Sequence, residues 1–158
     1  MVLEFFQYSS AEAYIKEYNF ENIEPFTFIL YDNGKLFELR WDGKQKHAKQ
    51  LNPSEMHIWS SSTLYTDEIK AKRKEWFAAW QKQHQTYDLE AILNFHRYAG
   101  EGDPWNDVIM NRMGMVQTVS ITNIINTAES ISMHYHDLVN EGFKKAQISL
   151  EGEVVESS

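Results

Sequence analysis

The amino-acid sequence predicts an α+β protein that combines antiparallel sheets with helices, and three observations indicate this class. Residues 26–31 are rich in aromatic and β-branched side chains, and Asn33-Gly34, a pair suited to a tight hairpin turn, follows them. Residues 66–80 carry large apolar side chains at helical spacing. Residues 115–125 alternate apolar and hydroxyl side chains, which is typical of a half-buried strand.

The N-terminal part of the chain predicts a helix and a three-stranded meander. Ser9 or Ser10 can cap a helix that continues to about Tyr18. The hairpin strand at 26–31 is expected to return through residues 35–41, where apolar and polar side chains alternate. A more polar strand at 46–51 then completes the meander.

Residues 57–80 predict a short strand at 57–59, a hydroxyl-rich turn and the strongest helix of the chain. Thr66 is the expected N-cap of that helix. The helix places four large side chains on one face, namely Ile69, Trp76, Phe77 and Trp80. Arg73 falls within the same stripe, so its guanidinium needs a partner if it is buried. Either its stem packs on Trp76 while its head reaches solvent or makes a structural ion pair, or it faces a ligand.

The hydroxyl-rich turn is a second candidate binding feature. Ser60, Ser61, Ser62 and Thr63 lie just before a helix N-terminus, where backbone amides favour anions. The alternative is that these hydroxyls only cap the turn and the helix.

The C-terminal part predicts a helix from an Asp88 cap to about Ala99, then strands at 115–125 and 131–138. Val119, Ile121 and Ile125 are expected on one face of the first of these strands. In the second, His134 and His136 share the polar face; two such histidines can chelate a metal, but without a third ligand the expected interpretation is that they are solvated. We expect a single domain over residues 1–146 and a disordered acidic tail over residues 147–158.

Composition excludes several functional classes. With 15 basic and 23 acidic residues the net charge is -8, which argues against nucleic-acid or anionic-membrane partners. No apolar run has the length of a membrane span, and the N-terminus lacks signal-peptide features, so a cytoplasmic location is expected. The chain has no cysteine, which removes disulfides, thiolate metal sites and a cysteine nucleophile. No metal site and no catalytic residue is predicted.

Five phrases of the sequence resemble, in order, the C-terminal half of the NRDE-domain family, relatives of the transport and Golgi organisation protein. They are IEPFTFILYDNGKLFELRWDG (23–43), HIWSSSTLYTDEIKAKRKEWF (57–77), ILNFH (92–96), TVSIT (118–122) and MHYHDL (133–138). The resemblance implies part of an α-β-β-α sandwich like that of N-terminal-nucleophile hydrolases. Family members carry a cysteine after the initiator Met and an Asn-Arg-Asp-Glu motif. Here position 2 is Val2, and Asn111-Arg112 is followed by Met113-Gly114.

The resemblance therefore implies a non-catalytic C-terminal portion of such a protein, associated with a missing N-terminal half or forming a homo-oligomer. One alternative is the substrate-binding part of an amide hydrolase. The other is a trafficking protein for haem or a lipid metabolite, with Trp59, Tyr65 and Trp76 lining an apolar cleft. Haem is implied by the resemblance alone, and no other cofactor is expected. The predicted residues for a small-molecule ligand are Trp59, Ser60, Ser61, Ser62, Thr63, Tyr65 and Arg73.

Overall fold

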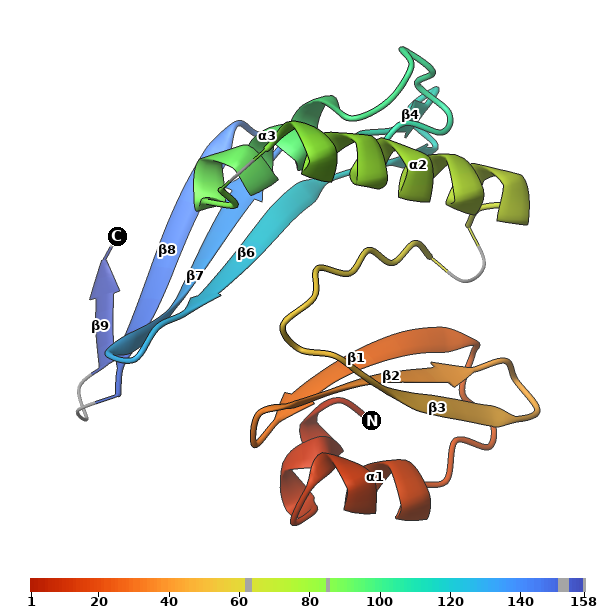
Figure 1. The fold of residues 1–158 in the computed structure, drawn as a ribbon, viewed down its shortest axis with the longest axis vertical. Helices are drawn as coiled ribbons and strands as arrows, with labels where there is room; N and C mark the ends of the chain where they lie inside the picture. The colour runs from red at the N-terminus through yellow and green to blue at the C-terminus, as the bar shows by residue number, and fades with distance from the viewer. Residues whose placement is uncertain (62–63, 85, 151–153, 158) are drawn as a thin grey trace. The chain divides into compact units, whose positions relative to one another are not determined.

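The structure, a computed structural model, describes residues 1–61, 64–84, 86–150 and 154–157 (Figure 1). It is an α+β protein with three antiparallel sheets and three α-helices in the described residues, which confirms the predicted class. The chain divides into two compact units, Met1–Lys74 and Glu75–Ser158. The residues expected to form one domain, 1–146, thus belong to two units.

The first unit contains a 3-10 helix, one complete α-helix and a three-stranded sheet of order β1-β2-β3. Ser10 caps α1 as predicted, because its Oγ accepts a hydrogen bond from the Ala13 amide at 3.1 Å. The elements are η1 (Leu3–Gln7), α1 (Ala11–Glu17), β1 (Phe26–Asp32), β2 (Lys35–Trp41) and β3 (Lys46–Leu51).

The hairpin between β1 and β2 confirms the predicted turn. Asn33 and Gly34 have φ values of 49° and 76°, the left-handed conformation that a two-residue turn of this kind requires. Asp32 is consequently paired with Lys35, and the register continues from that pair along both strands. The meander closes when β3 pairs with β2.

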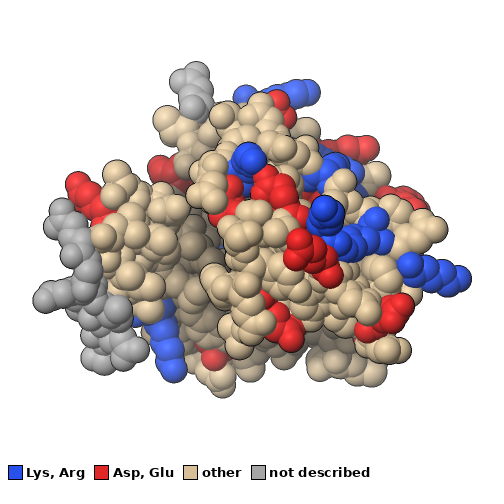
Figure 2. All heavy atoms as spheres, turned by 90° about the horizontal axis from the view of Figure 1, so that it is seen from below, with Lys and Arg blue, Asp and Glu red and all other residues tan. Residues whose placement is uncertain are grey.

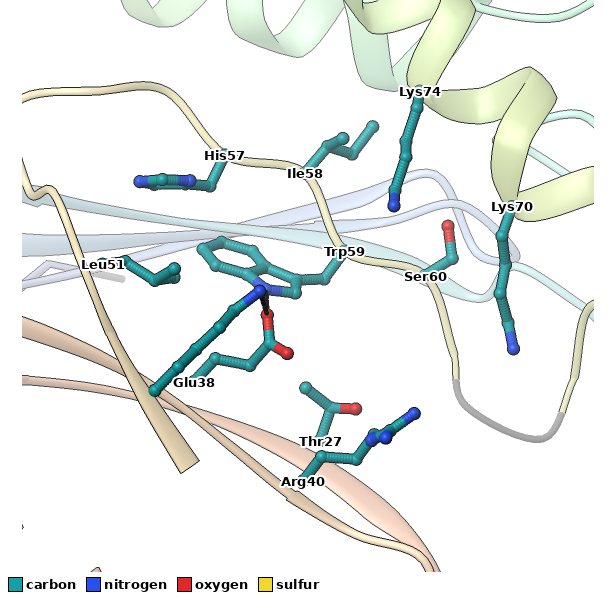
Figure 3. Close-up of a pocket in the computed structure, with 11 residues that line it drawn as sticks. Thr27, Glu38, Arg40, Leu51, His57, Ile58, Trp59, Ser60, Lys70 and Lys74 are labelled. Carbon is teal, nitrogen blue, oxygen red and sulfur yellow. Dashed lines mark hydrogen bonds and ion pairs between the residues drawn. The ribbon is translucent and has the colours of Figure 1, made fainter. Parts of the chain in front are cut away.

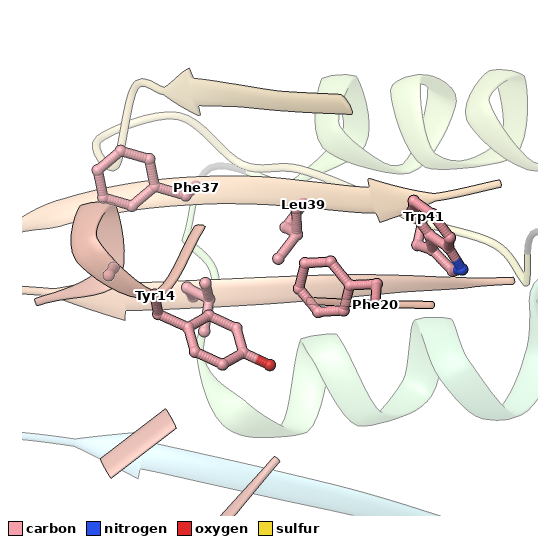
Figure 4. Close-up of a cluster of buried hydrophobic side chains, with 7 residues drawn as sticks. Tyr14, Phe20, Phe37, Leu39 and Trp41 are labelled. Atoms are coloured by element: carbon pink, nitrogen blue, oxygen red, sulfur yellow. The ribbon is translucent and has the colours of Figure 1, made fainter. Parts of the chain in front are cut away.

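The core of the first unit lies between α1 and one face of this sheet (Figure 4). Tyr14 and Phe20 pack against the side chains that β2 points inward, and Leu39 is fully buried among them. Trp41 also donates a hydrogen bond from Nε1 to the Ile23 carbonyl oxygen at 2.9 Å. Each fully buried large side chain contributes about 1.5–3 kcal/mol. The core residues are Ala11, Tyr14, Phe20, Leu30, Phe37, Leu39 and Trp41.

The segment that leads to the longest helix differs from the prediction. Residues 57–59 form no strand, and this segment contacts β2 through a side chain, the Trp59 indole, which donates to Glu38. The helix itself, α2 (Asp67–Gln83), begins where predicted, and the Ile69 amide donates to the Thr66 hydroxyl at 3.4 Å. The boundary between the two units falls within α2, after Lys74.

The second unit contains α3, a short hairpin and a four-stranded sheet of order β6-β7-β8-β9. Asp88 caps α3 as predicted, accepting a hydrogen bond from the Ala91 amide at 2.8 Å. The elements are α3 (Leu89–Tyr98), β4 (Asn111–Arg112), β5 (Val116–Gln117), β6 (Ser120–Asn126), β7 (Ser130–Asp137), β8 (Gly142–Ser149) and β9 (Val154–Ser157).

The strand predicted at 115–125 is interrupted. Thr118 bonds twice to Met110, through its amide and through its hydroxyl, so the chain leaves the β4–β5 hairpin before β6 begins. Val119 is consequently exposed instead of sharing a face with Ile121. Strands β8 and β9 were not predicted, and they overlap the segment expected to be a disordered tail, 147–158. No helix in the described part of the chain is long and apolar enough to cross a membrane.

A candidate anion-binding cavity in the first unit

The first unit contains a cavity of about 410 Å³ on the side of its sheet opposite to the core (Figure 3). Strands β1 to β3 supply one wall, and residues 57–60 with the first turns of α2 supply the other. The lining residues are Thr27, Glu38, Arg40, Lys49, Leu51, His57, Ile58, Trp59, Ser60, Lys70 and Lys74.

Strand alternation explains why these side chains share one wall. In β2, Phe37, Leu39 and Trp41 point into the core. Glu38 and Arg40 must therefore point to the opposite face, because successive side chains of a strand alternate. The register places Glu38 opposite Lys49 and Arg40 opposite Thr27. On α2, Lys70 and Lys74 are four residues apart and so lie on one helical face.

Positive charge dominates the cavity. Four lining side chains are cationic and one, Glu38, is a carboxylate, although the whole chain carries a net charge of -8. The carboxylate is already engaged, because its Oε2 accepts a hydrogen bond from Trp59 Nε1 at 2.8 Å and lies 3.5 Å from Lys49 Nζ. Lys70 Nζ also contacts the Asp67 carboxylate, at 3.4 Å.

The charge of the cavity differs from that of at least one face of the molecule. Figure 2 shows one face of the molecule, on which basic and acidic side chains are interspersed rather than separated by sign. Four cations gathered around one hollow are thus unlike the mixed surface of that face. Such a site favours a compact anion over a long polyanion, which would need an extended basic surface.

The structure places two of the predicted ligand residues, Trp59 and Ser60, in the cavity wall. Ser61 instead accepts a hydrogen bond from the Leu64 amide at 3.3 Å, so it stabilises the turn. Ser62 and Thr63 lie outside the described residues.

The remaining predicted pair, Tyr65 and Arg73, forms a stacked contact that is not part of the cavity wall. Arg73 is 7% exposed, and its guanidinium carbon lies 3.8 Å from the centroid of the Tyr65 ring. Of the interpretations open for Arg73, the one in which its head reaches water is thus wrong. A cation over an aromatic face gains electrostatic stabilisation that increases when water is excluded.

Sequence reasoning missed the charged part of the wall, which consists of Glu38, Arg40, Lys49, Lys70 and Lys74. Part of this wall could have been found in the sequence of the predicted strand at 35–41. There Glu38 and Arg40 alternate with apolar residues, which places both charged side chains on the other face of the strand. The cross-strand register and the reach of Lys70 and Lys74 toward the sheet required the tertiary structure.

The second unit contains a different cavity, of about 360 Å³, between α2 and α3. Aromatic side chains dominate its wall, and His84 lies among them. The His84 Nδ1–H donates a hydrogen bond to the Trp80 carbonyl oxygen at 2.8 Å, which leaves Nε2 as the lone-pair nitrogen in the neutral ring. The lining residues are Trp76, Ala79, Trp80, Gln83, His84, Asn94, Phe95, Tyr98, Ala99 and Gly100.

His134 and His136 share a face of β7 as predicted, but that face is the more buried one. The Nε2 atoms of both rings and Asn123 Oδ1 are inaccessible to solvent and have no hydrogen-bond partner in the described structure. Both histidines are partly exposed, so the expected solvation holds for part of each ring but not for its Nε2 atom. The described residues contain no group of three His, Cys, Asp or Glu side chains placed to hold a metal ion.

Comparison of the chain with models of known protein families, with curated proteins and with solved structures gives no match.

Proposed function

We propose that this chain is a non-catalytic ligand-binding protein whose first unit binds a small, multiply charged anion. One observation carries the proposal. In a protein of net charge -8, a cavity of about 410 Å³ is lined by four cationic side chains and by one carboxylate that is already engaged.

The energetic argument favours an anion with at least two charges. Unit charges about 4 Å apart interact with about 4 kcal/mol at the effective dielectric constant of a protein surface. Carboxylates already contact two of the four cations, Lys49 and Lys70, and a bound anion offsets the repulsion that remains among the four side chains. Thr27 and Ser60 add hydroxyl groups that can donate hydrogen bonds to its oxygen atoms.

Calorimetric titration with pyrophosphate tests the proposal. We expect saturable binding at low salt that weakens as the ionic strength rises, because screening reduces the attraction. The double variant Lys70→Gln, Lys74→Gln should weaken binding about tenfold or more, equivalent to about 1.4 kcal/mol for two lost charges. The matched control is Lys16→Gln, Lys44→Gln, which changes the net charge equally at exposed positions of the same unit outside the cavity wall.

Two results would count against the proposal. Sulfate and citrate are titrated in the same way as pyrophosphate. If none of the three anions binds, the proposed anion site is contradicted. Equal weakening by the cavity variant and by its control would show that net charge alone, rather than the cavity, attracts the anion.

A second candidate function, binding of haem or an apolar metabolite, is supported by the cavity of the second unit. Trp76, Trp80, Phe95 and Tyr98 supply apolar aromatic walls, and the neutral His84 ring has the tautomer whose Nε2 can ligate iron. Trp76 lies in the wall of this cavity, whereas Trp59 lies in the wall of the first-unit cavity. Titration with haemin tests the idea, since ligation gives a Soret band that His84→Ala should shift or abolish.

The relationship to the NRDE-domain family remains a proposal, supported by the order of the five phrases and by the α+β class. On this proposal the chain supplies a C-terminal framework, with part of an α-β-β-α sandwich, to an amide-hydrolase-like assembly. An experimental structure tests it directly. Sheets that do not stack face to face would contradict the sandwich.

A further inference from the structure

We infer that the ligand of the first-unit cavity carries a planar aromatic ring next to its anionic group, as a nucleoside diphosphate does. The inference rests on the proposed anion-binding function and adds the chemistry of the rest of the ligand. It follows from a division of the cavity wall into an aromatic end and a cationic end.

The aromatic end is held in place by hydrogen bonds. Trp59 donates from Nε1 to Glu38 Oε2 at 2.8 Å, and His57 donates from Nε2 to the Asn52 carbonyl oxygen at 2.8 Å. The centroids of the two rings are 5.6 Å apart, with 35° between their planes. Because both rings are anchored through polar atoms, they can offer a stacking surface without losing much side-chain freedom on binding.

The cationic end faces this surface across the cavity. Figure 3 shows the rings of His57 and Trp59 toward one end of the cavity, and Arg40, Lys70 and Lys74 toward the other. Leu51 adds an apolar contact beside the aromatic rings. An inorganic anion would occupy only the cationic end and leave the aromatic surface uncovered.

A ligand that joins a planar ring to a compact polyanion can contact both ends of the cavity, the ring at the aromatic end and the anion at the cationic end. Stacking of a base on an aromatic side chain strengthens binding by about fivefold to a hundredfold, as alanine substitutions show in other proteins. The positively charged side chains at the other end can form ion pairs with the oxygen atoms of a diphosphate. Trp59 is 36% exposed, so part of its ring remains accessible for such a contact.

Calorimetric titrations with ADP and with pyrophosphate, on the wild-type chain and two variants, test the inference. We expect the wild-type chain to bind ADP at least about fivefold more tightly than pyrophosphate. Trp59→Leu should abolish the preference, so that the variant binds ADP and pyrophosphate with equal affinity, whereas Trp59→Phe should retain part of the preference. Trp105→Leu, at a half-exposed position of the other unit, is the matched control. Circular dichroism establishes that each variant is folded.

The outcomes separate this inference from the proposed function. Equal wild-type affinity for ADP and pyrophosphate, with binding weakened by Lys70→Gln, Lys74→Gln, overturns the aromatic-ring inference and keeps the anion site. An ADP preference that persists in Trp59→Leu also overturns it. Absence of binding by both ligands overturns both proposals.

Discussion

Arg73 combines two features that conflict unless a partner is present, a permanent charge and almost complete burial. The structure resolves the conflict in part by stacking the guanidinium on the Tyr65 ring at 3.8 Å. Stacking suits arginine better than lysine, because the guanidinium is planar and weakly hydrated. Arg73, the charged residue within the apolar stripe of α2, is therefore part of the packing of that helix.

Replacing Arg73 tests this contact. Arg73→Ala should lower the free energy of unfolding by about 2 kcal/mol or more, because a desolvated cation–π contact and a packed side-chain stem are lost together. Arg73→Lys should recover only part of that loss. Urea denaturation followed by circular dichroism measures both, with Lys82→Ala at the exposed end of α2 as the control. A loss below about 0.5 kcal/mol, typical of surface substitutions, would contradict the packing role.

His136 illustrates a different cost of burial. Burial, then Arg97 and then His134 lower the pKa of His136 from its ordinary value. Arg97 Nη2 lies 3.4 Å from His136 Nδ1, and Phe143 packs against the ring with centroids 5.0 Å apart. A neutral imidazole fits this environment, and a protonated one would place two positive charges side by side.

The pH dependence of stability follows from that lowered pKa. In the unfolded chain the histidine takes up a proton near its ordinary pKa of about 6.5, whereas the folded state resists protonation until lower pH. The folded state should therefore lose stability as the pH falls below about 6.5. His136→Phe should flatten this part of the curve of unfolding free energy against pH. An unchanged slope in the variant would assign the acid sensitivity to other groups.

At the scale of elements, Lys46 joins α1 to the sheet. Its ammonium donates to three carbonyl oxygens at the end of α1, those of Ile15, Lys16 and Tyr18, at 2.5, 3.3 and 3.2 Å. It also lies 5.1 Å from the centroid of the Phe20 ring. A cation at this position complements the negative end of the helix dipole. Burial lowers the pKa of Lys46 from its ordinary value, so these contacts compensate for lost hydration.

Lys46→Met tests this connection because it keeps the apolar stem and removes the donor. We expect the free energy of unfolding to fall by about 1–3 kcal/mol, the cost of leaving partly buried carbonyl groups without a donor. Lys49→Met, three residues along the same strand and more exposed, provides the comparison for general charge loss. A change no larger than that of Lys49→Met would mean that the carbonyl groups find other partners.

Elements with strong local signals could be predicted from the sequence. The Asn33-Gly34 turn fixes its own conformation, and Ser10, Thr66 and Asp88 cap helices through side chains close in sequence. Strand β8 lacked such a signal, since Lys144 and Lys145 interrupt its alternation. Its pairing with β7 fixes it instead. The strand expected at 57–59 was wrong, since three apolar and aromatic residues carry no local signal that fixes a partner strand.

The candidate site was also predictable only in part, because only some of its residues carry a local signal in the sequence. Trp59 and Ser60 stood out as an aromatic and a hydroxyl group before a helix, and both line the cavity. Arg40, Lys49 and Lys74 look like ordinary surface charges in the sequence. They form a site because β2, β3 and α2 bring them around one hollow, which depends on contacts between residues far apart in the chain.

At the scale of the whole molecule, the expected self-association needs an exposed apolar surface, and the core-facing side of the first hairpin does not offer one. Phe26, Phe28 and Leu30 of β1 pack against the core of the first unit, so their face is closed. The sheet of the second unit instead exposes an apolar row. Ile124 and Met133 are cross-strand partners, and they are 66% and 46% exposed. Ile148 of β8 lies on the same face and is 50% exposed.

We predict that a second copy of the chain covers this row. The chain carries a net charge of -8, so two copies repel each other, and contact through an uncharged surface such as this one adds least to that repulsion. A two-fold contact between the two rows is self-complementary, and a stable interface should bury more than about 1,000 Å² in total. Light scattering after size exclusion should show a dimer, and the variant Ile124→Lys, Met133→Lys should be monomeric. Val139→Lys, at an exposed turn position outside the row, should remain dimeric. A wild-type chain that is monomeric at tens of micromolar would show that the row tolerates water and would remove the predicted interface.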